Sequence, residues 1–222
     1  MRIILQKELE NLKNMIFEIS RYAKESIIAA IDYIRTGSEE NLSKVKRLEE
    51  DSDLLNLEVF EKCVAIIARQ QPLARDLRFV LMAFNISSFY ERICDIAVEI
   101  CELGATEFKE KFEDEVLDEV ERIIIWMVKR VITMIEINED SLRRGDIRDL
   151  KKNLESIDNE IDQLFKEAMN TIADYLEKGL LKAKEAISLA LIIRHIERIG
   201  DIVAKTGARI VYIEKGSHVW IK

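Results

Sequence analysis

Two pairs of carboxylates with the same spacing are the residues of this chain best suited to do chemistry. Glu91 and Asp95 belong to the sequence Glu-Arg-Ile-Cys-Asp, and Glu197 and Asp201 belong to Glu-Arg-Ile-Gly-Asp. On a helix, residues four apart share a face, with Cβ atoms roughly 5–6 Å apart. If the helices bring the two pairs together, four carboxylates lie near one another. Such groups suit hard cations such as magnesium, calcium and manganese, and iron when further ligands help.

The surroundings of the two pairs predict two unequal sites. Glu99 extends the first acidic face by four residues, whereas Lys205 stands at the corresponding place in the second half. The second site is therefore expected to be the less acidic one. Asp51 and Asp158 lie at comparable places upstream and are weaker candidate ligands.

A structural interpretation stands beside the functional one. Considered alone, a Glu and an Asp four apart are usually solvated surface groups paired with a neighbouring arginine, here Arg92 or Arg198. Because the motif occurs twice, the metal-binding and the surface interpretations are about equally supported. His195 lies two residues before Glu197, about 200° around the helix, so we expect it to be packed or hydrogen-bonded rather than a ligand.

Long helices must position these residues. The 222 residues include one proline and seven glycines, and apolar residues recur at three and four, which predicts an all-α protein. Apolar residues make up 48% of the chain, enough for a substantial core. Glycines, Pro72 and candidate caps at Ser38 and Asp146 delimit the segments. The predicted helices are 5–35, 39–69, 72–103, 114–144, 147–178 and 180–206, the last extended by a turn or two.

The helices form two similar halves. The motif repeats after 106 residues, and Asp51 and Asp158 are 107 residues apart. We therefore predict two tandem three-helix bundles related by internal duplication. The first comprises residues 1–104, the second 113–222 with a C-terminal tail, and residues 105–112 connect them.

Composition limits the class of protein. The net charge of −8 disfavours direct nucleic-acid binding, which needs a basic surface. No apolar run is long enough to span a bilayer and the start does not resemble a signal peptide, so we expect a soluble cytoplasmic protein. The three cysteines, Cys63, Cys94 and Cys101, favour a reducing compartment and are expected to be buried small hydrophobes rather than metal ligands.

Several motifs together resemble the PhoU family of phosphate-uptake regulators. Residues 70–78, Gln-Gln-Pro-Leu-Ala-Arg-Asp-Leu-Arg, are similar to a conserved stretch of that family, and Glu-Arg-Ile-Gly-Asp marks both of its halves. The resemblance covers nearly the whole chain, including the Val211-Tyr212 ending. Two departures are Cys94, in place of the usual glycine, and residues 202–205 after the second motif. We expect Asp76 and Arg78 of the first stretch to pair structurally rather than to contact a partner.

The resemblance implies a fold and a function. It implies a cytoplasmic, non-enzymatic regulator, often a homodimer, that couples a phosphate ABC transporter ATPase to a sensor histidine kinase and reaches the membrane only through these partners. It also implies iron, zinc, magnesium or manganese bound by the repeated motifs. Matched residue by residue, the implied metal ligands are Glu91, Asp95, Glu197 and Asp201, with Glu99 as a weaker candidate.

Other functions remain as alternatives. A similar helical protein could serve an ion-coupled phosphate permease. A ferritin-like metal-dependent oxidase needs Glu-x-x-His pairs on two helices, but Ile192 and Lys215 stand three residues before the two histidines. No glycine-rich phosphate loop or metalloprotease motif is present in the sequence. A coiled-coil or solenoid scaffold is disfavoured because the apolar pattern stops about every thirty residues.

Overall fold

Six long helices build the described part of the protein. The computed structural model describes residues 2–105 and 117–221, in which no strand occurs, and the predicted all-α class is confirmed. No helix among these residues is both long and apolar enough to cross a membrane. The helices are α1 (Arg2–Thr36), α2 (Glu39–Gln70), α3 (Ala74–Ala105), α4 (Asp118–Arg144), α5 (Leu150–Glu177) and α6 (Ala183–Lys215).

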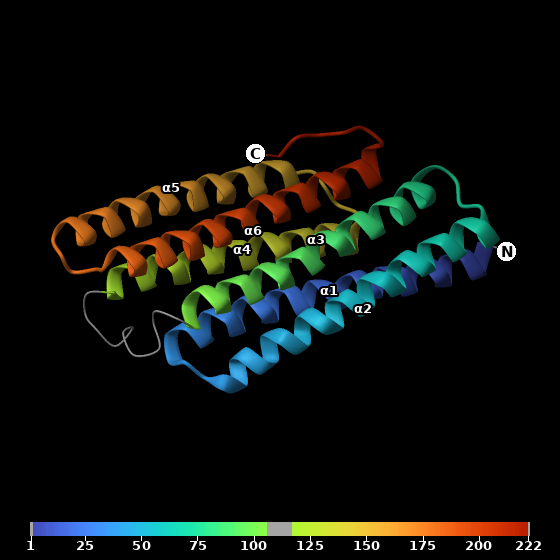
Figure 1. Cartoon of the computed structure of the whole chain (residues 1–222). Helices are drawn as coiled ribbons and strands as arrows, with labels where there is room; N and C mark the ends of the chain where they lie inside the picture. The colour runs from blue at the N-terminus through green and yellow to red at the C-terminus, as the bar shows by residue number, and fades with distance from the viewer. Residues whose placement is uncertain (1, 106–116, 222) are drawn as a thin grey trace.

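The helices form two three-helix bundles that lie side by side (Figure 1). Helix α1 packs on α2 and α3, and α4 packs on α5 and α6. The bundles meet where α3 packs against α6 and, less extensively, where α1 touches α4. Helices α2, α3, α6 and α5 therefore follow one another as a layer, with α1 and α4 behind it (Figure 1). This arrangement confirms the predicted tandem bundles.

Apolar residues at helical spacing form the core. In α1, Leu12, Ile16, Ile19, Ala23 and Ile27 are all at most 1% exposed, which places one face of the helix fully in the bundle. Burying a side chain of leucine or isoleucine size contributes about 1.5–3 kcal/mol. The repeated burial along each helix therefore supplies the free energy that fixes how neighbouring helices pack, and so which of their polar residues face one another.

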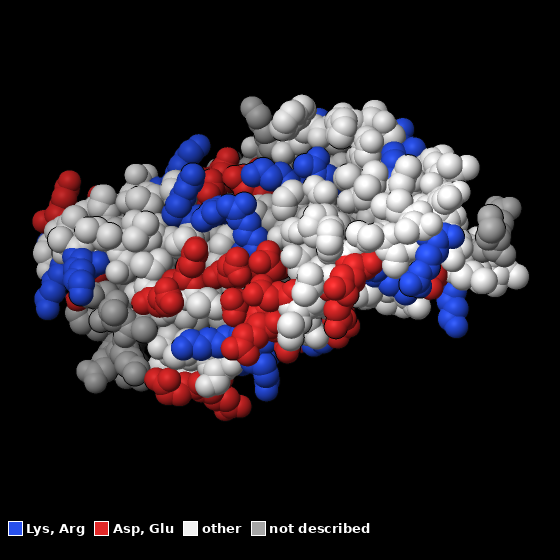
Figure 2. Space-filling view, turned by 45° about the vertical axis from the view of Figure 1, so that its right-hand side comes forward, with Lys and Arg blue, Asp and Glu red and all other residues white. Residues whose placement is uncertain are grey.

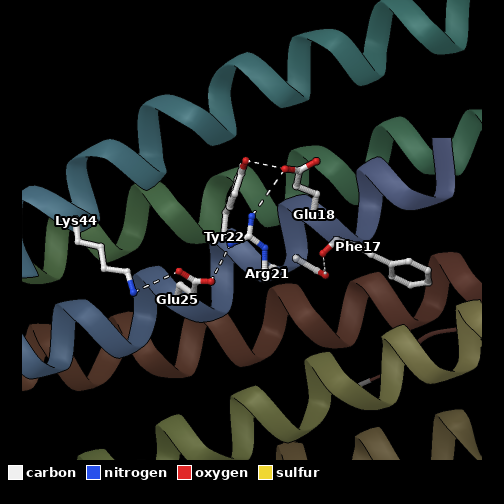
Figure 3. Close-up of polar contacts among 7 residues, drawn as sticks. Phe17, Glu18, Arg21, Tyr22, Glu25 and Lys44 are labelled. Carbon is white, nitrogen blue, oxygen red and sulfur yellow. Dashed lines mark hydrogen bonds and ion pairs between the residues drawn. The ribbon is translucent and has the colours of Figure 1, made fainter. Parts of the chain in front are cut away.

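Polar contacts on the outer face of α1 add smaller contributions (Figure 3). The guanidinium of Arg21 lies between the carboxylates of Glu18 and Glu25, at 3.8 and 2.9 Å. Lys44 of α2 reaches Glu25 at 3.3 Å, and the Tyr22 hydroxyl donates to Glu18. Exposed pairs of this kind contribute about 0–1 kcal/mol each, so they orient α1 against α2 more than they stabilise the fold.

Most predicted helix ends are close to the observed ones. Gly37 and Gly145 have φ of 67° and 68°, the left-handed conformation in which glycine ends a helix without steric cost. The Ser38 hydroxyl accepts from the Asn41 amide and caps α2, as predicted. The connector at 105–112 and the predicted start of a helix at Asp114 fall almost entirely outside the described residues.

Four predicted helix starts differ from the observed ones by two or three residues. Helix α1 begins at Arg2 and α6 at Ala183, and the starts of α3 and α5 differ for local reasons. Pro72 lies in the break between α2 and α3 rather than in the first turn of α3, which begins at Ala74. Asp146 does not cap α5. Its carboxylate accepts from the amide and the guanidinium of Arg148 in a local turn, so that α5 begins at Leu150. At Asp146 the local turn competes with the first helical turn. Around Pro72 the helix is interrupted by the positive φ of Gln71 and Ala74, which is 48° at both residues.

Two glycines near predicted helix ends are also sites of close packing. Helix α6 continues through Gly207 to Lys215, in line with the predicted extension beyond Thr206. A Cβ atom added at Gly207 would lie 2.2 Å from Leu154 Cδ1. At Gly104, inside α3, it would lie 2.1 Å from Ile34 Cγ2. The absence of a side chain at these positions lets the neighbouring helices approach.

Two arginines of the stretch 70–78 hold the end of α6. The guanidinium of Arg75 makes two hydrogen bonds to the Glu214 carboxylate, at 2.6 and 2.9 Å. Arg78 donates to the carbonyl oxygen of Ile213, where the last turn of α6 leaves carbonyls without helical partners. Arg78 thus makes a structural contact of the kind expected for it, and this contact joins the two bundles.

We predict that Gly104→Ala destabilises the protein by about 1–3 kcal/mol, the usual cost of overpacking a core. The new methyl group meets Ile34, whose Cβ is 3.0 Å away and whose β-branched side chain has little rotamer freedom. Urea denaturation followed by circular dichroism measures the change. Gly200→Ala is the control, because the nearest atom to its methyl group is the flexible end of Ile161, at 3.1 Å, and Asp158 Oδ1 lies at 3.8 Å. Equal losses in both variants would contradict the packing explanation.

Candidate metal site

The first carboxylate pair faces a second pair on the neighbouring helix. Glu91 and Asp95 of α3 lie opposite Glu49 and Asp53 of α2, because the two helices run antiparallel and pack along their length (Figure 1). One oxygen each from Glu49, Asp53 and Asp95 lies within 4.8 Å of the others. Among the residues that the structure describes, this is the one group of three potential ligands at that spacing.

Burial and like charge both act on this first cluster, defined as Glu49, Asp53, Glu91 and Asp95. The pKa of Glu91 is raised to about 7, first by burial and then by the charges of Asp95 and Asp53. Burial also raises the pKa of Glu49 and of Asp95, with Asp53 contributing to each. A folded protein that holds these groups together has a site at which a cation would relieve repulsion.

A second cluster, defined as Asp158, Asp162, Glu197 and Asp201, lies between α5 and α6. The pKa of Asp158 is raised to about 6 by burial and then by Asp162 and Asp201. Burial also raises the pKa of Glu197, while Arg194, whose guanidinium is 2.9 Å away, opposes this change. The second oxygen of Glu197, Oε2, is buried and has no hydrogen-bond partner.

The structure thus contains one cluster in each bundle. The charges that raise the pKa of Glu91 all come from α2 and α3, and those acting on Asp158 come from α5 and α6. Each motif pair is completed by its own bundle rather than by the other motif. Because α2, α3, α6 and α5 form one layer, the clusters occupy the same broad side of the molecule. Acidic side chains gather across the middle of the face seen in Figure 2.

Glu99 and His195 meet at the junction of the bundles. Glu99 Oε2 lies 3.3 Å from His195 Nδ1, without the geometry of a hydrogen bond. Glu99 still contributes to the raised pKa of Asp95, but it extends toward α6. The pKa of His195 is lowered by burial, and Glu99 opposes this change. His195 is half-buried at the contact between α3 and α6, in keeping with the packed role expected for it.

The sequence interpretation missed the candidate ligands on α2 and one of those on α5. Glu49 and Asp53, like Asp158 and Asp162, are pairs with the same four-residue spacing as the motifs. They are related by 109 residues rather than the 107 that link Asp51 to Asp158. Asp51 is exposed and lies two residues from both members of the α2 pair, so it projects from another side of the helix. The sequence signal that could have revealed these residues is a pair of acidic residues four apart on each of two consecutive helices.

The residues present fit a hard cation. Carboxylate oxygens are the preferred ligands of magnesium, calcium and manganese, and they also bind iron and zinc. The tight group in the first cluster and the unpaired Glu197 Oε2 in the second offer such oxygens. The thiols do not compete: Cys63, Cys94 and Cys101 are buried without disulfides, and burial raises the pKa of Cys94 to about 11. Their predicted role as buried hydrophobes is in agreement with this.

The chain matches a family model twice. The model described as the PhoU domain matches residues 16–104 and 124–210, once in each bundle. A protein of Archaeoglobus fulgidus named phosphate-specific transport system accessory protein PhoU homolog is 30% identical over 223 residues, all of both chains. The Escherichia coli phosphate-specific transport system accessory protein PhoU is 25% identical over 211 residues, covering 94% of this chain and 84% of that one.

Solved structures share the fold. The crystal structure of PhoU from Pseudomonas aeruginosa superimposes with a TM-score of 0.83 at 20% identity, covering 96% of this chain and 99% of the other. The phosphate transport system regulatory protein PhoU from Streptococcus pneumoniae gives 0.80 at 21% identity, covering 97% and 99%. At this level of identity the likeness concerns the arrangement of the helices.

We predict that Glu91→Gln stabilises the metal-free protein at pH 8 and has little effect near pH 4.5. In the unfolded chain Glu91 ionises around its ordinary value of 4.5, but in the folded protein it ionises only around 7. The folded state therefore holds more protons between these values, so wild-type stability falls as pH rises through this window and stays lower above it. After discounting for solvent screening, about 1 kcal/mol is expected, or about 2–4 °C in melting temperature.

Thermal melts in chelator at pH 4.5, 6 and 8 measure this effect. Glu61→Gln, at an exposed position of the neighbouring helix α2, is the control. A stabilisation by Glu91→Gln that is the same at every pH would show that ionisation of Glu91 is not its cause.

Proposed function

Because the chain belongs to the PhoU family, we propose that it is a regulatory accessory protein of a phosphate transport system. The observation that carries the proposal is the whole-chain similarity to relatives named as accessory proteins of that system, with one family match in each bundle. In this proposal the protein works without catalysis, by binding to partners at the cytoplasmic side of the membrane.

The proposed partners are the ATPase of a phosphate ABC transporter and a sensor histidine kinase, and the proposed assembly is a homodimer. An elongated protein with two similar bundles offers two related surfaces, which suits a component that joins two partners. The function is regulatory in this scheme: contact with the ATPase restrains uptake, and contact with the kinase keeps the phosphate-starvation response off.

We further propose that the carboxylate clusters bind divalent or ferric metal ions. Glu49, Asp53, Glu91 and Asp95 would hold one site, and Asp158, Asp162, Glu197 and Asp201 the other. A bound cation would neutralise carboxylates whose pKa values are raised by burial and by mutual repulsion, and it would tie α2 to α3, or α5 to α6. The first site has the tighter group of oxygens, and Arg194 and Lys205 make the surroundings of the second less negative.

We predict that Asp95→Asn lowers the affinity for metal by about tenfold or more, while His195→Ala leaves it nearly unchanged. Asp95 belongs to the close oxygen group, whereas His195 contacts Glu99 at the junction with α3. The protein is prepared in metal-rich medium, desalted and examined by elemental analysis and by titration with manganese. Asp51→Asn, on another side of α2, is the matched control. Absence of metal from the wild-type protein, or equal losses in both variants, would refute the proposed site.

The regulatory proposal predicts that affinity capture from native cells, grown with and without phosphate, recovers a phosphate transporter ATPase or a sensor histidine kinase. Mass spectrometry identifies the captured proteins, and a capture with the tag alone is the control. Recovery of an ion-coupled phosphate permease instead would favour the accessory alternative. Recovery of none of these under either condition would contradict a role in phosphate transport.

A further inference from the structure

An exposed apolar strip runs along the adjacent sides of α2 and α3, next to the first carboxylate cluster. It consists of Leu57, Phe60, Val64 and Ile67 of α2 and Leu81 and Phe84 of α3. Leu57 is 56% and Val64 is 51% exposed, so these side chains are not the margin of a core. Contiguous apolar surface of this kind marks interaction sites on proteins.

The strip and the acidic cluster follow one another along the adjacent sides of α2 and α3, and this surface is called the α2–α3 groove. The rings of Phe60 and Phe84 meet across it, with centroids 5.1 Å apart. One helical turn or two further along, Asn56 Oδ1 accepts hydrogen bonds from the hydroxyls of Ser87 and Ser88, at 2.6 and 3.3 Å. The carboxylates of the first cluster lie beyond these hydrogen-bonded residues. The groove is thus apolar at one end and acidic at the other.

The strip is a second apolar face of α2. The core-facing side of this helix is already filled by Val59, Cys63 and Ile66, which are at most 5% exposed. Residues 57, 60, 64 and 67 recur at three and four on the side next to α3. A helix with two apolar faces can bury both only if other helices pack on both. In α2 the core-facing side is packed by α1 and α3, and the residues of the strip stay exposed.

The α2 side of the groove is strongly negative, whereas α3 contributes one cation at the acidic end, Arg92, whose charge acts on Asp95. Between residues 49 and 67, α2 carries six acidic residues and one basic residue, Lys62, which is paired with Glu8 of α1. The exposed acidic residues Glu50, Asp53 and Glu61 border the strip and the cluster. A ligand of this groove must therefore bring positive charge as well as apolar surface.

The second bundle shows how a cation is placed in such a groove. Between α5 and α6, the Arg194 guanidinium lies 5.7 Å from the centre of the Phe165 ring and pairs with Glu197 of the acidic cluster. The corresponding positions of the first bundle hold Ser88 and Asn56, related by the 106- and 109-residue offsets. The first groove thus has the acidic cluster and the apolar strip but no cation of its own at the point between them.

We propose that the α2–α3 groove binds an amphipathic helix of a partner protein, with its apolar side on the strip and its Lys or Arg residues facing the acidic end. A helix lying along two antiparallel helices has the geometry of a four-helix bundle, and binding of an amphipathic helix in an apolar groove is a common mode of recognition. This inference goes beyond metal binding, and its test is made in chelator so that the two are separate.

Two other occupants fit the groove less well. A second copy presenting the same face would bring Glu50, Asp53 and Glu61 toward the acidic residues of its own counterpart, which like charges oppose. A membrane surface with anionic lipids would meet the same repulsion. Both occupants are outcomes that the experiment below separates from the proposal.

The probe is a fluorescent synthetic helix of about 20 residues, with Leu recurring at three and four and Lys at one end of its polar face. We expect saturable one-to-one binding to the full chain in chelator, measured by anisotropy. Leu57→Ser with Val64→Ser should weaken binding at least tenfold, and Glu50→Lys with Glu61→Lys should do the same at low salt. A peptide with Glu in place of Lys should bind at least tenfold more weakly than the Lys peptide.

The matched control is Ile28→Ser with Leu176→Ser, two similarly exposed apolar residues outside the groove, which should leave binding unchanged. Absence of binding, equal binding of the Lys and Glu peptides, or equal loss in the control variant would overturn the proposal. Two further results would overturn it. One is a wild-type dimer in sedimentation that Leu57→Ser with Val64→Ser abolishes. The other is flotation of the wild-type protein with phosphatidylcholine vesicles that the same variant abolishes.

Discussion

The packing of α3 against α6 is the contact on which the rest of the structure depends. Each of these helices carries a copy of the repeated motif, and each is surrounded by the other two helices of its bundle and by the other motif helix. Their contact joins the bundles into one layer and places both acidic clusters on the same side. Polar contacts follow the seam, from Arg78 at the end of α6 to Glu99 beside His195.

This layer holds together groups that repel one another. Buried apolar side chains stabilise each bundle strongly enough to keep four carboxylates between neighbouring helices, even though burial and like charge raise the pKa of Glu91 and Asp158. A fold of this kind is well suited to respond to a cation, because binding relieves the repulsion between the clustered carboxylates. The two halves differ in how far nearby basic side chains offset this repulsion, since Arg194 pairs with Glu197 in the second bundle and Ser88 occupies the corresponding position in the first.

The duplicated architecture also explains why one side of the protein can serve several contacts. In both bundles the acidic cluster borders apolar residues on the same pair of helices, but the first bundle exposes the longer apolar strip. Divergence at a few positions, such as Ser88 against Arg194, changes the chemistry of a groove without changing the helices that build it. Two similar bundles can therefore recognise different ligands.

The sequence by itself determined the helical class, the duplication and the two motif pairs, because the 3.6-residue period, the scarcity of helix breakers and the repeat are local properties. It also placed Gly37 and Gly145 correctly at helix ends. Only the tertiary structure decided that Glu49, Asp53 and Asp162 complete the clusters, since the register of antiparallel helices sets which pairs face each other. It likewise decided that Gly104 and Gly207 serve helix packing and that Glu99 extends toward His195, because both depend on neighbours distant in the chain.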